Sequence, residues 1–259
     1  MTSLYPFALF LTVFVVAEGN SLSRIIGGVN VQMRDHPWQA SLQRSGSHIC
    51  GASFIDNNWL VTAAHCVNNQ NIGSLTIGYG HASRGSHRSA TIQEIIMHPE
   101  YTEDGASGYP HDIALLRLAS PVVFGSETNK IALPSEDINA PLDNCYITGW
   151  GCSSMILGIC FTTPDLLQGT TISVLTKESC NSAWTSINIL DVHVCVTESG
   201  KSGCSGDSGG PLSCQQYGTT VLGGATSWGS STCSTTLPTV YTRVSEYVPW
   251  IRKTTGLQK

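Results

Sequence analysis

Short apolar runs separated by turn residues follow one another along most of the 259-residue chain, and they constrain its fold more than any other feature. Each run has the length of a strand and is rich in β-branched and aromatic residues. Their regular spacing is typical of a β-barrel or a β-sandwich. No helical pattern alternates with them, which argues against a parallel α/β sheet. Clear examples are WQASLQ (38–43), WLVTAAH (59–65), DIALLRL (112–118), CYITGWG (145–151) and TVYTRV (239–244).

The end of the chain has a different pattern, in which apolar residues recur at helical spacing between Ser245 and Gly256. Ser245 is a suitable N-cap and Gly256 a suitable stop, so we expect one helix over about 245–255. A polar stretch near 125–140 would divide the preceding residues into two β units. A cleft between such units is a usual place for a functional site.

The first residues predict export from the cell. An apolar run, Leu4–Ala17, is too short to cross a bilayer and ends in small residues, which is typical of a cleaved signal peptide over residues 1–17. The chain has ten cysteines, and an even set in an exported protein indicates disulfides. We therefore expect a secreted, extracellular protein.

The charge pattern and the spacing of possible metal ligands argue against two classes of function. The formal charge is −5 and no basic cluster occurs, so the sequence does not favour nucleic acid as a partner. It contains neither a C-x-x-C pair nor an H-E-x-x-H motif. Between Cys66 and Gln93 there is no Asp or Glu for a calcium loop. We expect no metal and no cofactor.

Ser208, in the segment GDSGGP (206–211), is a candidate nucleophile. The segment also fits the G-x-S-x-G elbow of α/β-hydrolases, a fold that places an acid and then a histidine after the serine. No histidine follows His193 and no aspartate follows Asp207. Chain order and fold class therefore both exclude the elbow.

A serine hydroxyl is a poor nucleophile unless a positioned base takes its proton. His65 is the best candidate because it closes an apolar run and adjoins Cys66, whereas we expect the other seven histidines mostly to be solvated. Asp112, before the apolar run IALLRL, is a candidate for the acid that orients the imidazole, since a buried carboxylate needs a partner. An aspartate before a strand is also a common turn residue, so Asp112 alone carries little weight.

Taken in chain order, three motifs resemble those of the chymotrypsin-like (trypsin-fold, S1-type) serine proteases, and of their chymotrypsin/elastase-like subgroup. They are TAAHC (62–66), DIALL (112–116) and GDSGGP, with support from IIGG (25–28), HPW (36–38), GWG (149–151) and SWG (227–229). The resemblance implies an all-β fold of two packed antiparallel six-stranded β-barrels, with the active site in the cleft between them and a C-terminal helix. The implied peptidase domain, 25–259, consists of an N-terminal barrel (about 25–130), a C-terminal barrel (about 131–244) and the helix (about 245–255).

The resemblance also implies a mechanism through an acyl-enzyme. Ser208 would attack the scissile carbonyl, His65 would take its proton and deliver it to the leaving amine, and Asp112 would hold the imidazole tautomer. The backbone N–H groups of Gly206 and Ser208 would form the oxyanion hole. Glycine suits position 206 because no side chain blocks the oxyanion.

By the same resemblance, residues 18–24 form an activation propeptide that is cleaved after Arg24. The new amino group of Ile25 would pair with Asp207 and order the oxyanion loop, since a buried unpaired carboxylate is costly. The chain would then be a zymogen that needs a trypsin-like activating protease.

Four disulfides are implied by the resemblance, and we expect the two remaining cysteines to form a fifth. For these two, an intermolecular bond and free thiols are the alternatives. The expected pairs are Cys50–Cys66, Cys145–Cys214, Cys180–Cys195, Cys204–Cys233 and, as the fifth, Cys152–Cys160.

The family's substrate pocket has its floor six residues before the nucleophile, at Ser202. Ser202 carries no charge, so a buried substrate Lys or Arg would lack a partner. The implied walls are Ser227, Trp228, Gly229 and Thr239; Gly229 leaves the mouth open and the β-branched Thr239 narrows the interior. We expect cleavage after Leu, Met, Phe and Tyr.

Three other functions compete with this expectation. They are an elastase-like preference for small aliphatic residues, a catalytically silent homologue that acts as a binding protein, and a trypsin-like regulatory protease. The complete set of triad motifs argues against the second and Ser202 against the third. The acidic charge and the lack of an accessory domain favour a digestive enzyme. Expected partners are protein or peptide substrates, the activating protease and protein inhibitors, with no nucleic acid or membrane, and we expect a monomer.

Overall fold

The computed structural model describes residues 25, 27–156 and 159–258. The expected signal peptide, propeptide and Arg24 lie outside the described residues. Within the described ranges, no helix combines the length and the apolar character that crossing a bilayer requires.

Six antiparallel strands close the first barrel in the order β2-β3-β4-β7-β6-β5. Alternation of apolar and polar residues explains its filling: in β7 Leu116 faces the barrel interior, whereas Arg117 is exposed. Leu42, Phe54 and Ile77 from other strands pack against Leu116 in the same cluster. The strands are β2 (Gln39–Arg44), β3 (Ser47–Phe54), β4 (Trp59–Thr62), β5 (Leu75–Tyr79), β6 (Arg88–Met97) and β7 (Ala114–Leu118).

A second barrel of six antiparallel strands has the order β11-β12-β15-β14-β13-β8 and is closed by pairing of β11 with β8. The short strand β1 (Val29–Asn30) adds to the edge of β11. Ile25 is fully buried in the core of this barrel beside Leu212 and Tyr241. The strands are β8 (Asp143–Gly149), β11 (Gln168–Val174), β12 (His193–Thr197), β13 (Pro211–Gln216), β14 (Thr219–Trp228) and β15 (Thr239–Arg243).

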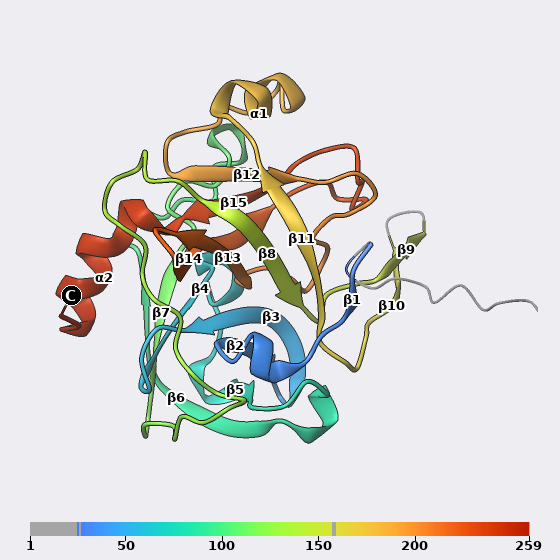
Figure 1. Cartoon of the computed structure of the whole chain (residues 1–259). Helices are drawn as coiled ribbons and strands as arrows, with labels where there is room; N and C mark the ends of the chain where they lie inside the picture. The colour runs from blue at the N-terminus through green and yellow to red at the C-terminus, as the bar shows by residue number, and fades with distance from the viewer. Residues whose placement is uncertain (1–24, 26, 157–158, 259) are drawn as a thin grey trace, which may run out of the picture.

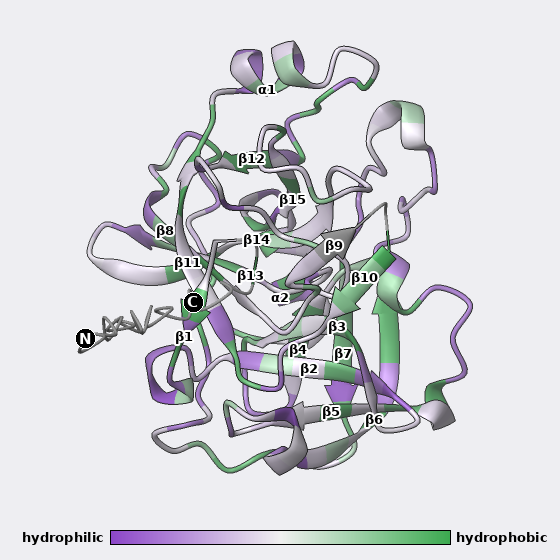
Figure 2. Ribbon diagram, turned by 90° about the vertical axis from the view of Figure 1, so that its right-hand side faces the viewer, coloured by the Kyte–Doolittle hydropathy of each residue, from purple (hydrophilic) through white to green (hydrophobic). Residues whose placement is uncertain are grey.

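Apolar side chains also fill the junction between the barrels. Leu115 of β7, Leu222 of β14 and Ile251 of helix α2 (Val248–Thr255) belong to one cluster. Figure 1 shows the two barrels one above the other with α2 packed along their side, and Figure 2 shows hydrophobic residues spread over the strands of both. The predicted all-β fold of two six-stranded barrels with a C-terminal helix is confirmed.

Two details of the helices differ from the sequence prediction. Ser245 lies in a 3-10 turn (Val244–Tyr247) and caps nothing; α2 begins after Tyr247, which makes no side-chain capping bond. A further helix, α1 (Lys177–Ala183), was not predicted, because its seven residues are too few to show an apolar repeat. Its start is nevertheless encoded, since Thr176 Oγ1 accepts a hydrogen bond from Ser179 N–H at 3.2 Å.

Five disulfides brace the two barrels, and no described cysteine is free. A short hairpin of β9 (Ser154–Ile156) and β10 (Ile159–Thr162) forms where the fifth pair closes its loop. The pairs are the five that the sequence analysis expects: Cys50–Cys66, Cys145–Cys214, Cys152–Cys160, Cys180–Cys195 and Cys204–Cys233.

Candidate active site

Asp112 is fully buried at the start of the segment that leads into β7, and its carboxylate is held by three donors. Oδ2 lies 2.7 Å from His65 Nδ1 and accepts a hydrogen bond from Ser227 Oγ at 2.6 Å. Oδ1 accepts the backbone N–H of His65 at 2.9 Å. Thr242 Oγ1 donates to the Asp112 carbonyl at 2.8 Å. These contacts join the first barrel to β14 and β15 of the second.

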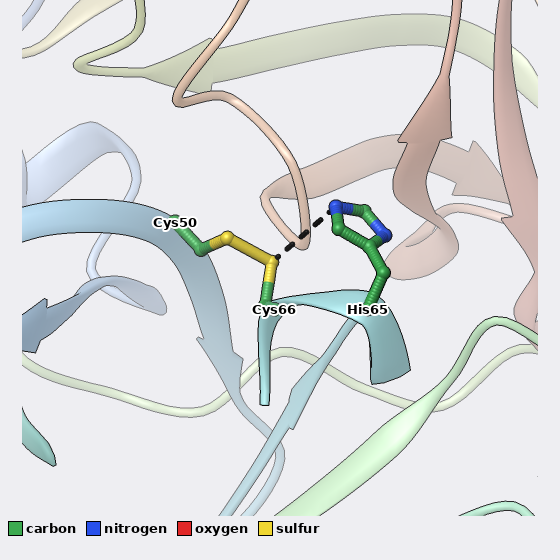
Figure 3. A group of neighbouring side chains, drawn as sticks. All are labelled: Cys50, His65 and Cys66. Carbon is green, nitrogen blue, oxygen red and sulfur yellow. Dashed lines mark hydrogen bonds between the residues drawn. A yellow bond between two sulfur atoms is a disulfide. The ribbon is translucent and has the colours of Figure 1, made fainter. Parts of the chain in front are cut away.

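His65 lies in a 3-10 turn (Ala64–Cys66) just after β4. The sequence suggested that His65 closes the strand, but β4 ends before it. The disulfide between Cys50 of β3 and Cys66 anchors this turn (Figure 3). His65 Nε2 lies 3.7 Å from Cys66 Sγ. The turn therefore presents the ring beside Asp112 with one face open, the side chain being 34% exposed.

Two opposing effects set the pKa of His65. Burial lowers it, but the hydrogen bond that His65 donates to Asp112 and the negative charges of Asp112 and Glu103 outweigh burial, and the pKa lies above the ordinary value of 6.5. The bond to Asp112 also fixes the tautomer, because a neutral ring that donates from Nδ1 keeps its lone pair on Nε2. Nε2 is then the atom able to take a proton.

Ser208 is partly buried at the mouth of a pocket in the second barrel. The loop that carries it is tied to the first barrel, because Ser208 O accepts the Gly51 N–H at 2.7 Å. Among the described residues no hydrogen bond joins Ser208 Oγ to His65 Nε2. Hydrogen bonds between a serine hydroxyl and its general base are often long or poorly aligned before substrate binds.

Gly206 has a φ of +95°, a conformation that side chains disfavour. Its carbonyl lies 2.9 Å from His48 Nε2, and His48 Nδ1 lies 2.8 Å from Ser41 Oγ. Burial lowers the pKa of His48 to about 4, so the ring is neutral at pH 7 and donates from Nε2. His48 was expected to be a solvated histidine; instead it is buried and bonds the carbonyl of Gly206, the residue whose own N–H is a proposed oxyanion donor.

Asp207 is buried and accepts two backbone hydrogen bonds, from Gly151 N–H at 2.9 Å and from Cys204 N–H at 3.0 Å. Burial outweighs these bonds and raises the pKa of Asp207 to about 6. A Cβ on Gly149 or Gly151 would overlap the Asp207 carboxylate. The two glycines of the Gly149-Trp150-Gly151 motif therefore leave room for the buried carboxylate of Asp207.

The pocket beside Ser208 has a volume of about 240 Å³ and is lined by the Cys204–Cys233 loops and the strands β14 and β15. Ser227, Trp228, Gly229 and Thr239 line it as expected. Ser202 is buried beside Thr239 and is not among the residues that line the pocket. Its hydroxyl lies 3.3 Å from Thr239 Oγ1 and donates to Gly203 O. None of the described lining residues is charged.

One group of possible metal ligands lies at the site: Cys50, His65 and Cys66. It does not suit a metal, because both sulfurs are bonded in a disulfide and neither can become the thiolate that binds metal. The chemistry that the arrangement supports is therefore proton transfer by the imidazole of His65, which is oriented by Asp112.

Comparison with known proteins agrees with this geometry. The family model described as "Trypsin" matches residues 25–251, and the chain therefore belongs to the trypsin family of serine proteases. A relative is "Fibrinolytic enzyme, isozyme C" of Lumbricus rubellus, which is 37% identical over 243 residues that span 88% of this chain and 98% of the relative.

Proposed function

We propose that the protein is a secreted serine endopeptidase, made as a zymogen, that cleaves after medium-to-large hydrophobic residues. The hydrogen-bonded pair of His65 and Asp112 carries the catalytic part of this proposal. In the proposed reaction Ser208 Oγ attacks the scissile carbonyl while His65 Nε2 takes its proton, and the protonated ring then gives that proton to the leaving amine. Water attacks the acyl-enzyme by the same proton transfers in reverse.

Asp112 has two proposed tasks in this reaction. Its hydrogen bond keeps the proton of the neutral ring on Nδ1, and its negative charge stabilises the imidazolium that forms when Nε2 takes the serine proton. The N–H groups of Gly206 and Ser208 are the proposed donors to the developing oxyanion. The left-handed backbone at Gly206 and its contact with His48 support this role.

The uncharged lining of the pocket carries the proposed specificity. A buried Lys or Arg of the substrate would lose its hydration without gaining a counter-charge. A cavity of about 150 Å³ accommodates a benzene ring, so a pocket of about 240 Å³ has room for Leu, Met, Phe or Tyr. The methyl group of Thr239 lies 3.6 Å from where a Cβ of Gly229 would be, so these two residues lie side by side in the pocket wall.

A profile of the cleaved enzyme on peptide amides that differ only in the residue before the scissile bond tests the proposed specificity. We expect Leu, Met and Phe to be best; a best substrate with Arg or with Ala would overturn it. Thr239→Gly should raise the ratio of kcat/KM for Phe to kcat/KM for Leu. The increase in this ratio should not exceed the roughly 10–200-fold discrimination that one methylene group provides. The exposed Thr236→Gly is the matched control and should leave the ratio unchanged.

The proposed specificity has a consequence for activation. An enzyme with an uncharged pocket should cleave poorly after Arg24, so the proposed zymogen depends on a separate trypsin-like protease. Pure uncleaved chain that cleaves itself after Arg24 would contradict this dependence.

We also propose a digestive role, which the net charge of −5 supports.

A further inference from the structure

Three possible metal ligands converge at the segment that leads to Asp112. His98 directly follows β6, Glu100 lies two residues further on, and His111 directly precedes Asp112. One ligand atom of each residue lies within 4.8 Å of those of the other two. The rings of His98 and His111 are stacked, with centroids 5.1 Å apart and planes inclined by 15°.

The surroundings of this His98–Glu100–His111 cluster suit metal binding. Tyr247 Oη lies 3.0 Å from His111 Nδ1; when Nδ1–H donates to this oxygen, His111 Nε2 keeps the lone pair that a metal takes. His98 Nδ1 accepts a long hydrogen bond, 3.3 Å, from Glu100 N–H, which ligation through either nitrogen of His98 would end. Glu100 forms no ion pair with another described residue.

We propose that His98, Glu100 and His111 bind one Zn²⁺ ion, and that zinc bound there lowers the rate of hydrolysis. Two imidazoles and one carboxylate are a ligand set that zinc accepts, with water in the fourth position. Ligand atoms around tetrahedral zinc lie about 3.3 Å apart. The ligand atoms must therefore approach one another by up to about 1.5 Å.

The backbone couples this cluster to the catalytic acid. His111 has a φ of +60°, and its carbonyl accepts the Ile113 N–H at 2.8 Å, which closes a tight turn around Asp112. Movement of His111 toward zinc therefore shifts Asp112 relative to His65. The charge of the ion also opposes the imidazolium that forms during catalysis. This inhibitory half rests on the proposed function, whereas zinc binding does not.

Zinc binding is measured on chain that carries Ser208→Ala, which prevents self-digestion. Equilibrium dialysis with ZnCl₂ should give one ion per chain, and CoCl₂ should give the visible absorption of four-coordinate cobalt. Adding His111→Asn to this chain should weaken zinc binding by at least about tenfold. Asparagine is chosen because it tolerates the left-handed backbone conformation at position 111. Glu100→Gln should weaken zinc binding too, whereas His81→Asn, an exposed control, should not. Unchanged affinity in the His111→Asn chain, or no binding at all, would overturn the site.

The inhibitory half is measured on the active, cleaved enzyme. We expect kcat/KM to fall as Zn²⁺ is added, with the midpoint found by dialysis, and the ratio of rates with and without zinc to approach one in Glu100→Gln. Inhibition that keeps its midpoint in His111→Asn would place zinc elsewhere and refute the proposal. Zinc bound at the cluster with no change in kcat/KM would refute the coupling to Asp112.

Discussion

Two buried aspartates belong to the candidate active site, and they differ in their hydrogen-bond partners. The Asp112 carboxylate has an imidazole, a hydroxyl and a backbone N–H as partners. Asp207 has two backbone N–H groups and, among the described residues, no cationic partner. Burial raises the pKa of Asp207 to about 6. Asp112, the proposed catalytic acid, is therefore satisfied by the fold alone, whereas burial of Asp207 has a cost that the proposed pairing with a cation would remove.

The largest expected effect is that of Asp112→Asn in the cleaved enzyme. Asparagine can donate to Nδ1, which favours the wrong tautomer of His65 and removes the charge that stabilises its cation. We expect kcat to fall about 10⁴-fold, a magnitude known for this family's triad and not calculated from the present geometry. Asp191→Asn, which removes an exposed carboxylate, is the control. A loss below tenfold would show that Asp112 is not the catalytic acid.

Asp207→Asn should have the next largest effect, and only after cleavage at Arg24. A neutral side chain cannot pair with the amino group of Ile25, so the Gly206 N–H would be left without its ordered position. We expect kcat/KM of the cleaved enzyme to fall about 10²–10³-fold, the usual loss of one oxyanion donor. The uncleaved chains with Asp and with Asn should be equally slow. Full activity of the cleaved variant would refute a role for Asp207 in activation.

The stability of the uncleaved chain gives a third test of Asp207. Its pKa is about 6 in the folded chain and about 3.8 when unfolded, so the folded state binds the proton more tightly. Stability is therefore fully present below pH 3.8 and is lost as the pH rises through 6. Urea unfolding should show that the free energy of unfolding, relative to Asp207→Asn, falls by about 3 kcal/mol between pH 3.5 and pH 7. A difference independent of pH would contradict the raised pKa.

Ser227→Ala should have the smallest effect, because it removes one of the partners of Asp112. We expect kcat/KM to fall about tenfold, equivalent to about 1.4 kcal/mol. The freed carboxylate then bonds His65 more strongly, so the acid limb of the pH–rate profile should move further above 6.5. Thr242→Val is the matched control, because Thr242 bonds the Asp112 carbonyl and not the carboxylate. Equal shifts in both variants would rule out the specific effect of Ser227.

The fold was largely predictable, because strand-length apolar runs and turn residues carry the barrel pattern locally. The short helix α1 was not, since seven residues show no repeat. The motifs indicated His65, Asp112 and Ser208, yet the support of Asp112 by Ser227 depends on residues 115 positions apart. His48 was missed for the same reason, since its bond to Gly206 spans 158 positions.

The proposed zinc cluster shows the same limit of sequence reasoning. We expected no metal because no short ligand motif occurs. His98 and His111 lie on two segments that come together only when His98 N–H pairs with Ile113 O at 3.0 Å. Ser202 shows that limit as well, because its contact with Thr239 Oγ1 at 3.3 Å joins residues 37 positions apart.

The measurement that tests the account most directly is kcat/KM on a Leu or Phe peptide amide before and after cleavage of the Arg24–Ile25 bond. A trypsin-like protease should produce a chain that begins with Ile25, and kcat/KM should rise at least about 10²-fold as Asp207 gains its cation. The same rate with the bond intact would contradict the claim that Asp112 is partnered by the fold and Asp207 only by cleavage.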